Sequence, residues 1–137
     1  DARTLDAATP GGEQNERDHK MVGERTGAGD FGARKWRHAI DGGWFSYEMK
    51  VLAGKPQELL VTYWGSDGGN RNFDILVDGK KVATQRLEGS RPGRFFDQVY
   101  PLPADLTEGK EKVTVRFQAH SGCSAGGIFD LRIMKRP

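Results

Sequence analysis

The segment WGSDGGNR, which begins at Trp64, gathers side chains that can bind a polar ring-shaped ligand. Trp64 offers an aromatic face for apolar C–H groups, and Asp67, Asn70 and Arg71 offer hydrogen-bonding groups within the same short stretch. A hairpin turn can be made by two residues, as the Asp-Gly pair at 78–79 illustrates a few positions downstream. The longer segment therefore predicts a recognition surface, and sugars are the ligands that suit this mixture of ring faces and hydrogen bonds.

A second group of the same chemical kind lies earlier in the chain, where Trp36, Arg37 and His38 are adjacent. We expect this group, together with His120, to meet the Trp64 segment and to complete one binding surface for glycan or for a neighbouring domain. The alternative for each tryptophan, Trp44 included, is simple packing within the fold. The alternative for the charged residues is exposure to solvent or pairing with nearby carboxylates.

Motifs for catalysis and for metal binding are missing from the sequence. Three scattered histidines and one cysteine make no Cys-x-x-Cys or His-Glu-x-x-His pattern, and no nucleophile elbow is present. The GAGDFG stretch at 27–32 lacks the strand and helix of a dinucleotide site. We expect a non-enzymatic chain without cofactor or metal. A bound calcium ion is kept as an alternative, because the Asp-rich loops lack the ligand pattern of an EF-hand but carry many oxygens.

Size and charge narrow the class further. The 137 residues suit one domain, and the formal net charge of +2 comes from 21 basic and 19 acidic residues that are mixed along the chain. This pattern does not indicate nucleic-acid binding. No apolar run approaches the length of about 20 residues that a membrane helix needs. Residues 1–17 are polar and without periodicity, so they are expected to be a linker that leads into a folded domain at 18–137.

The folded part alternates with a period of two, which is typical of β-strands. In GWFSYEMKV, Phe45, Tyr47 and Met49 fall on one face while the polar residues fall on the other. The runs with strand character are 43–51, 58–64, 72–78, 81–87, 94–100, 112–120 and 127–135, with a further one near 19–23. Apart from one helical turn at PADL, no helical period is found. The pattern predicts an all-β chain folded as an antiparallel two-sheet sandwich of the jelly-roll kind.

Alternation also predicts the core and the positions of the loops. The expected core residues are Phe45, Tyr47, Leu59, Val61, Phe73, Ile75, Val77, Val113, Val115, Phe117, Leu131 and Ile133. If successive strands run up and down, the connections 25–42, 65–71, 88–93 and 121–126 meet at one end of the sandwich. These four connections hold most of the residues that a plain turn would not require.

Several stretches support a resemblance to known modules. The runs GWFSYEMKV, FDILVDGKKVAT and EGKEKVTVRFQA resemble the galactose-binding-like sandwiches found among carbohydrate-binding modules. In addition, KWRHAIDGGWFSYEMKV, YWGSDGGNRNFDILVDGKKVA and AGGIFDLRI resemble the C-terminal β-sandwich of beta-L-arabinofuranosidase-type glycoside hydrolases, which are common in gut Bacteroides. That resemblance covers residues 12–135. It implies a non-catalytic accessory domain, secreted or periplasmic, whose catalytic (α/α) barrel belongs to another part of the parent protein.

Two main hypotheses therefore stand at this point, and a free-standing enzyme is kept as a third alternative. In the first, the polar end of the sandwich binds a polysaccharide or oligosaccharide. In the second, the same end docks on the catalytic barrel of the parent chain and binds no sugar itself. A concave site with an aromatic ring beside Asp67 and Arg71 favours the first hypothesis, and a flat surface favours the second.

Overall fold

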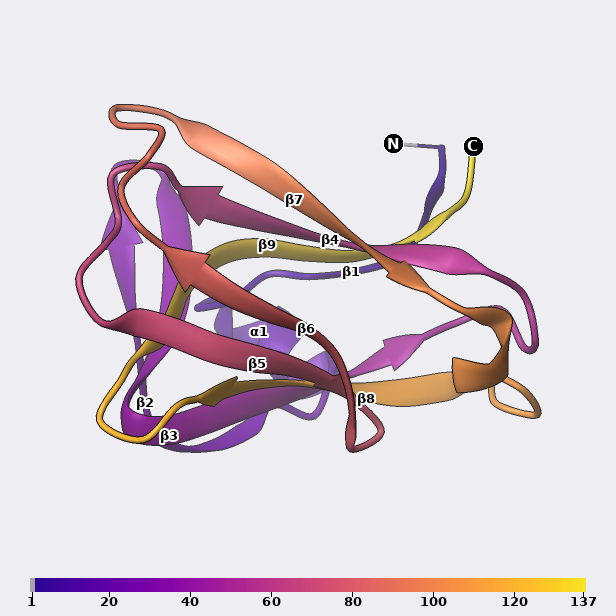
Figure 1. Cartoon of the computed structure of the whole chain (residues 1–137). Helices are drawn as coiled ribbons and strands as arrows, with labels where there is room; N and C mark the ends of the chain where they lie inside the picture. Colours follow the sequence, from indigo (N-terminus) through magenta and orange to yellow (C-terminus); the bar gives the residue numbers. More distant parts are fainter. Residues whose placement is uncertain (1) are drawn as a thin grey trace.

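The chain is an all-β protein in the computed structural model, which describes residues 2–137 (Figure 1). Its strands are β1 (Thr4–Ala8), β2 (Val22–Phe31), β3 (Arg34–Lys50), β4 (Gln57–Trp64), β5 (Arg71–Val77), β6 (Lys80–Leu87), β7 (Phe95–Leu102), β8 (Lys112–Ala119) and β9 (Ala125–Lys135). The helical elements are α1 (Glu13–Asp18) and a single 3-10 turn, η1 (Ala104–Leu106), which confirms the helical turn expected at PADL. None of these helical elements is long and apolar enough to cross a membrane.

The strands form a nearly closed antiparallel sandwich, as the alternation predicted. Hydrogen-bonded neighbours follow the order β6-β5-β8-β3-β9-β4-β7, with β1 added beside β9 and β2 beside β3. The long strand β3 belongs to both layers: residues 44–50 pair with β8, whereas Arg37 and Ala39 pair with β9. One strand therefore connects the two sheets around the core.

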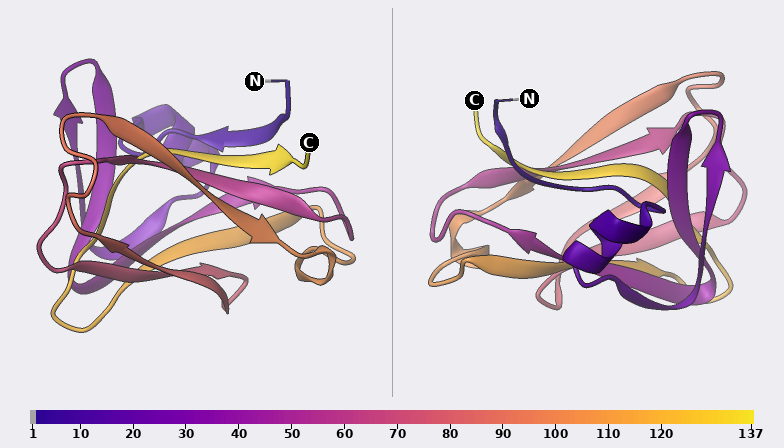
Figure 2. Two further views of the ribbon diagram at one scale, coloured as in Figure 1. Left: turned by 45° about the horizontal axis from the view of Figure 1, so that its top comes forward. Right: turned by 180° about the vertical axis from the view of Figure 1, so that it is seen from behind.

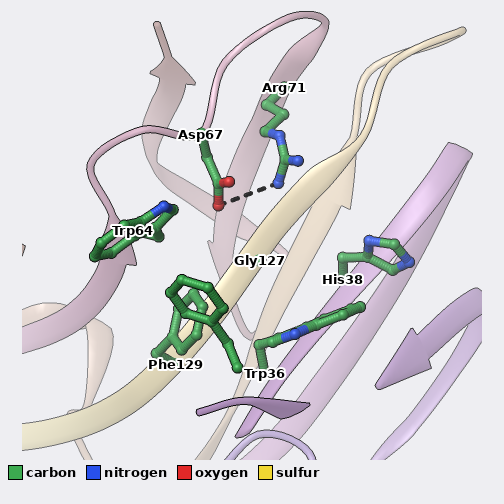
Figure 3. A pocket seen from close by; sticks show the side chains of 8 residues that line it. Trp36, His38, Trp64, Asp67, Arg71, Gly127 and Phe129 are labelled. Atoms are coloured by element: carbon green, nitrogen blue, oxygen red, sulfur yellow. Dashed lines mark ion pairs between the residues drawn. The ribbon is translucent and has the colours of Figure 1, made fainter. Parts of the chain in front are cut away.

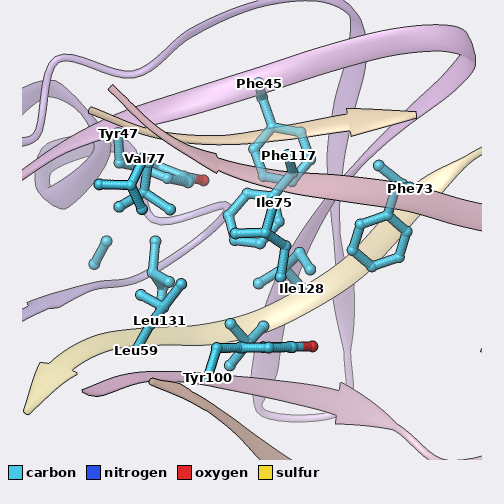
Figure 4. Packing of buried hydrophobic residues seen from close by; sticks show 14 of the residues in the cluster. Phe45, Tyr47, Leu59, Phe73, Ile75, Val77, Tyr100, Phe117, Ile128 and Leu131 are labelled. Carbon is cyan, nitrogen blue, oxygen red and sulfur yellow. The ribbon is translucent and has the colours of Figure 1, made fainter. Parts of the chain in front are cut away.

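The core between the layers consists of the side chains that the period of two selects (Figure 4). All of the expected core residues are buried, and the strand β3 shows the rule clearly, because Phe45, Tyr47 and Met49 are fully buried. Phe45 stacks on Phe117 of the paired strand β8, with ring centroids 5.2 Å apart. Cross-strand aromatic contacts of this kind stabilise a sheet beyond the area that they bury.

The expectation that residues 1–17 are a linker is wrong for the residues that the structure describes; Asp1 lies outside them. β1 pairs with β9, with Ala8 opposite Leu131, and Ala8 is fully buried. The helix α1 follows, and its Glu16 is buried against the sandwich. The polar sequence gave no sign of these elements because β1 is a short strand with few apolar residues and because the buried Glu16 is satisfied by specific hydrogen bonds.

A second correction concerns residues 25–42, which were expected to be a long loop. They form a hairpin of β2 and the first part of β3, with Phe31 opposite Arg34 around a tight turn. Glycines at 23, 27 and 29 replace the β-branched residues that usually mark a strand, so the sequence pattern did not reveal it. Figure 2 shows this hairpin at one end of the sandwich and both chain ends toward the other.

Candidate functional site

A cavity of 350 Å³ lies at the hairpin end of the sandwich (Figure 3). Its lining combines aromatic rings with a few polar side chains, as small-molecule sites usually do. The lining residues are Phe31, Trp36, His38, Trp64, Asp67, Arg71, Gly127 and Phe129. We call this cavity the aromatic pocket. It draws on the hairpin β2–β3, the connection from β4 to β5, and the start of β9.

The hairpin supplies the wall that carries Trp36 and His38. These residues are two apart on β3 and therefore share a face, and their rings lie 4.9 Å apart. Their partners on β2 are Gly29 and Gly27, which leave the space above that strand open. A Cβ atom at Gly29 would lie 2.5 Å from Cζ2 of Trp36, so the indole occupies the place of the missing side chain. Gly27 and Gly29, which removed the strand pattern from the sequence, also leave the space in which this wall forms.

The opposite wall comes from the connection between β4 and β5. Arg71 is held there by three acceptors: its guanidinium donates to the carbonyl oxygens of Gly68 and Gly126, both at 3.0 Å, and lies 3.2 Å from the Asp67 carboxylate. In Figure 3 these two charged groups stand above the aromatic rings. Because Arg71 joins the loop to the start of β9, the polar wall is positioned before any ligand arrives.

The loop itself is long because it packs against two other loops. The amide of Gly65 donates to the carbonyl of Arg94 at 2.7 Å, and a Cβ at Gly65 would collide with the Arg91 carbonyl. On its other side, the Asn70 amide donates to the carbonyl of Gly122 at 2.8 Å. The predicted recognition loop is therefore a fixed frame that presents Asp67 and Arg71.

Four aromatic rings form a continuous cluster along one side of the pocket. Phe31 at the hairpin tip is 45% exposed and contacts Trp64 edge-on, with centroids 5.0 Å apart. Phe95 lies 4.7 Å from Trp64 and 4.9 Å from Phe129. Sequence reasoning missed Phe31 and Phe129. The period of two along 127–135 could have found Phe129, which lies two residues before the expected core residue Leu131. Phe31 lies on the hairpin whose glycines leave no strand pattern, so the sequence carried no comparable signal for it.

Burial is the main cause of the pKa shifts of two groups in the pocket, Asp67 and His38. Burial raises the pKa of the Asp67 carboxyl, and the positive charges of Arg71 and His38 oppose this rise. Burial also lowers the pKa of His38, and Arg71 and Arg37 lower it further, so this imidazole is neutral at neutral pH. The pocket thus presents one guanidinium, one carboxylate and one neutral ring that can donate or accept a hydrogen bond.

The structure brings together five of the eight residues that the sequence singled out, namely Trp36, His38, Trp64, Asp67 and Arg71. The other three lie elsewhere. Arg37 points to the opposite face of β3, where its Nε donates to Glu16 at 2.7 Å. Asn70 binds the neighbouring loop, and His120 lies 2.8 Å from Asp74. The expectation for Arg37 was wrong because alternate residues of a strand face opposite sides.

Nothing in the described residues forms a side-chain metal centre: within 2–137, no three His, Cys, Asp or Glu residues cluster around a common point. A calcium ion can also be bound by backbone and amide oxygens, so the calcium alternative stays a prediction. Trp44, the third tryptophan, lies outside the pocket, where the Arg116 guanidinium stacks 3.9 Å from its ring.

Comparison with models of known protein families gives a match for this chain. Residues 1–134 match the model of a family described as a family of unknown function, DUF6805. The chain belongs to this family. No curated protein matches the sequence. The DUF6805 match begins at residue 1, which agrees with the finding that β1 and α1 are parts of the fold.

Solved structures share the fold of this DUF6805 member at low identity. A family 35 carbohydrate-binding module from Clostridium thermocellum is similar with a TM-score of 0.69 and 14% identity, over 96% of this chain and 99% of that module. The CBM35 from Paenibacillus barcinonensis gives 0.61 and 11%, over 85% and 93%. An exo-beta-1,3-galactanase from Phanerochaete chrysosporium, solved with beta-1,3-galactotriose, gives 0.63 and 11%, over 93% of this chain and 28% of that enzyme. These likenesses establish the jelly-roll fold.

Proposed function

We propose that this chain is a non-catalytic carbohydrate-binding module and that the aromatic pocket holds the sugar. The observation that carries the proposal is the position of Trp36 and Trp64 beside the fixed pair Asp67 and Arg71 in one cavity. Aromatic faces bind the C–H faces of sugar rings, and the charged pair supplies hydrogen bonds in the plane of the ring hydroxyls. The volume of 350 Å³ is at the small end of the usual range of about 300–1,000 Å³ for ligand pockets, which suits a short stretch of glycan.

The pocket does not offer the groups that glycoside hydrolysis requires. Glycosidases generally use two carboxyl groups across the scissile bond, about 5–10 Å apart depending on mechanism. Among the described residues that line the aromatic pocket, Asp67 is the only carboxylate, and Arg71 pairs with it. Binding without turnover is therefore the function that this geometry supports.

The shared fold supports the same proposal. Two of the similar structures are named as family 35 carbohydrate-binding modules, and the third is part of a galactan-degrading enzyme. We further propose that the chain is an accessory domain of a secreted or periplasmic glycoside hydrolase of the beta-L-arabinofuranosidase type. The alternative of docking on the catalytic barrel calls for a flat surface, and the hollow between Trp36 and Trp64 favours the sugar hypothesis over it.

Glycan-array binding and retention on immobilised polysaccharides test the proposal. Trp36→Ala should weaken binding by about 1–3 kcal/mol, roughly tenfold to a hundredfold, because the stacking platform is lost. Trp44→Ala is the matched control, since it removes the same side chain from the outer face of the other layer. Equal loss in both variants, or binding unchanged by Trp36→Ala, would contradict the proposal. If Trp36→Ala instead loosened the domain from a parent barrel, the docking alternative would be supported.

A further inference from the structure

A second hollow lies beside the turn of the β2–β3 hairpin, next to the aromatic pocket. It measures 400 Å³ and is lined by Thr9, Ala33, Arg34, Lys35, Phe129, Asp130 and Arg132. Phe129 lines both cavities, so the two are neighbours. A ligand longer than one sugar ring that lies in the aromatic pocket can therefore continue past Phe129 into this hollow.

Arg34 is the feature that gives this hollow a chemistry of its own. Its guanidinium lies 4.2 Å from the centre of the Phe95 ring and 5.9 Å from that of Phe129. No hydrogen bond or ion pair from its side chain to another residue is found within 2–137. A guanidinium that stacks on a ring keeps its N–H groups in the plane, directed away from the ring and available to an acceptor.

The charges around Arg34 favour an anionic acceptor. Arg34, Lys35 and Arg132 face the hollow against a single carboxylate, Asp130. Two of these cations already have partners: Arg132 lies 2.7 Å from Asp130, and Lys35 lies 2.8 Å from Asp30. The remaining unpaired cation is Arg34, which presents a planar pair of donors to the hollow. Such a fork suits the two oxygens of a carboxylate or a sulfate.

We propose that this hollow binds an anionic group, a carboxylate or a sulfate ester, carried by the same glycan that enters the aromatic pocket. This inference rests on the proposed function and adds the ligand class: an acidic polysaccharide. Arg34 would bind a carboxylate and a sulfate ester in the same way, and the experiment below distinguishes which of the two the glycan carries. Since the site is open to water, its contribution should decrease as salt increases.

Affinity electrophoresis of the whole chain provides the test, with two matched pairs of polymers in the gel. One pair is polygalacturonate and its methyl-esterified form, and the other is dextran sulfate and dextran. We expect stronger retardation by the anionic member of at least one pair, and the pair that responds identifies the source. Arg34→Gln should reduce that preference by roughly tenfold, because a charge-assisted bidentate contact is lost.

Arg116→Gln is the matched control, because it removes the same charge from a guanidinium that also stacks on an aromatic ring, but on the other layer. It should leave the preference intact. Equal retardation by both members of each pair, or an equal loss in Arg116→Gln, would overturn the second site. If the preference is absent while Trp36-dependent binding to array glycans persists, the proposed function stands and only this inference fails. Binding to no glycan at all overturns both.

Discussion

The indole of Trp36 lies across Gly29, its cross-strand partner in the β2–β3 hairpin. A Cβ built at Gly29 falls 2.5 Å from Cζ2 and 2.9 Å from Cε2 of that ring, so Trp36 keeps its place only because residue 29 has no side chain. The wall of the aromatic pocket thus requires a residue without a side chain at position 29 of β2.

Gly29→Ala should displace the indole and weaken glycan binding, with a cost to stability of about 1–3 kcal/mol from overpacking. The matched control is Gly27→Ala, two residues earlier on the same strand, where the nearest atom would be Nε2 of His38 at 3.9 Å, an ordinary contact. The indole N–H resonance of Trp36, assigned with Trp36→Phe, should shift in Gly29→Ala and stay in place in Gly27→Ala. Unchanged resonances in both variants would contradict the relationship.

Arg37 is predicted to be a stability residue. Its guanidinium contacts both carboxylate oxygens of Glu16 at 2.7 and 3.0 Å, and the Tyr47 hydroxyl donates to the same carboxylate at 2.7 Å. Only 7% of the Glu16 side chain is exposed. Arg37→Met should therefore lower the free energy of unfolding by about 3–5 kcal/mol, because it leaves a buried carboxylate without its cation.

Urea unfolding checks that value against a matched control. Arg86→Met breaks an exposed pair with Glu88 and should cost less than about 1 kcal/mol. Arg37→Met should still bind any glycan that the wild type binds, once it is measured at a temperature where the variant is folded. A loss of binding with stability unchanged would instead restore Arg37 to the recognition surface.

His19 predicts how stability depends on pH. Its two ring nitrogens face the carbonyl oxygen of Asn15 at 2.7 Å and the Asp6 carboxylate at 2.9 Å, so the doubly protonated ring is favoured. Burial lowers the pKa of His19, but the hydrogen bonds to Asp6 and Asn15 outweigh it, and the net pKa is raised above 6.5. The stability that the charged ring contributes is fully present below pH 6.5 and is lost as pH rises through the folded-state pKa.

The free energy of unfolding from urea titrations at pH values on either side of 6.5 measures this contribution. The wild type should lose about 1 kcal/mol or more between the acidic and the alkaline condition, since the contact is charge-assisted. His19→Gln cannot change charge and should show a smaller decrease. Equal decreases in the two proteins would show that groups other than His19 determine the pH dependence of the free energy of unfolding in this range.

We predict that Asp67 contributes to ligand binding and lowers the free energy of unfolding. Because burial raises the pKa of its carboxyl, ionised Asp67 is less favourable in the folded state than in the unfolded chain, and the carboxylate lowers the stability of the fold at neutral pH. Asp67→Asn should therefore raise the free energy of unfolding by roughly 0.5–1 kcal/mol while weakening glycan binding, because one acceptor of the pocket is lost. Arg71 remains held by the carbonyls of Gly68 and Gly126 in that variant. A less stable Asp67→Asn protein would disprove this account.

The core was predictable because burial on one face of a strand leaves a period of two, and Phe45, Tyr47 and Met49 follow it without exception. The meeting of Trp36 with Trp64 and Arg71 was also predictable, because antiparallel strands bring alternate connections to one end. The hairpin was not, since its glycines carry no apolar pattern. Without that strand, the sequence could not show that Arg37 faces away from Trp36 and His38.

The N-terminal segment escaped prediction for a different reason. β1 contributes one edge strand and α1 less than two turns, so neither leaves a long periodic signal. Their attachment depends on single contacts at a distance in sequence, above all Glu16 with Arg37 and Tyr47. Such pairings are specified by the tertiary fold and have no local pattern.

The strand β3 carries the pocket wall at Trp36 and His38, the buried ion pair at Arg37, and the core residues Phe45 and Tyr47 on one unbroken piece of backbone. We therefore expect the wall to open less readily than a separate loop would, because its backbone continues directly into the core of the sandwich. Amide hydrogens near Trp36 should then exchange nearly as slowly as those near Tyr47, and a bound ligand should slow both together. A bound ligand should therefore also slow proteolysis of the whole domain, and not only of the loops that touch the ligand.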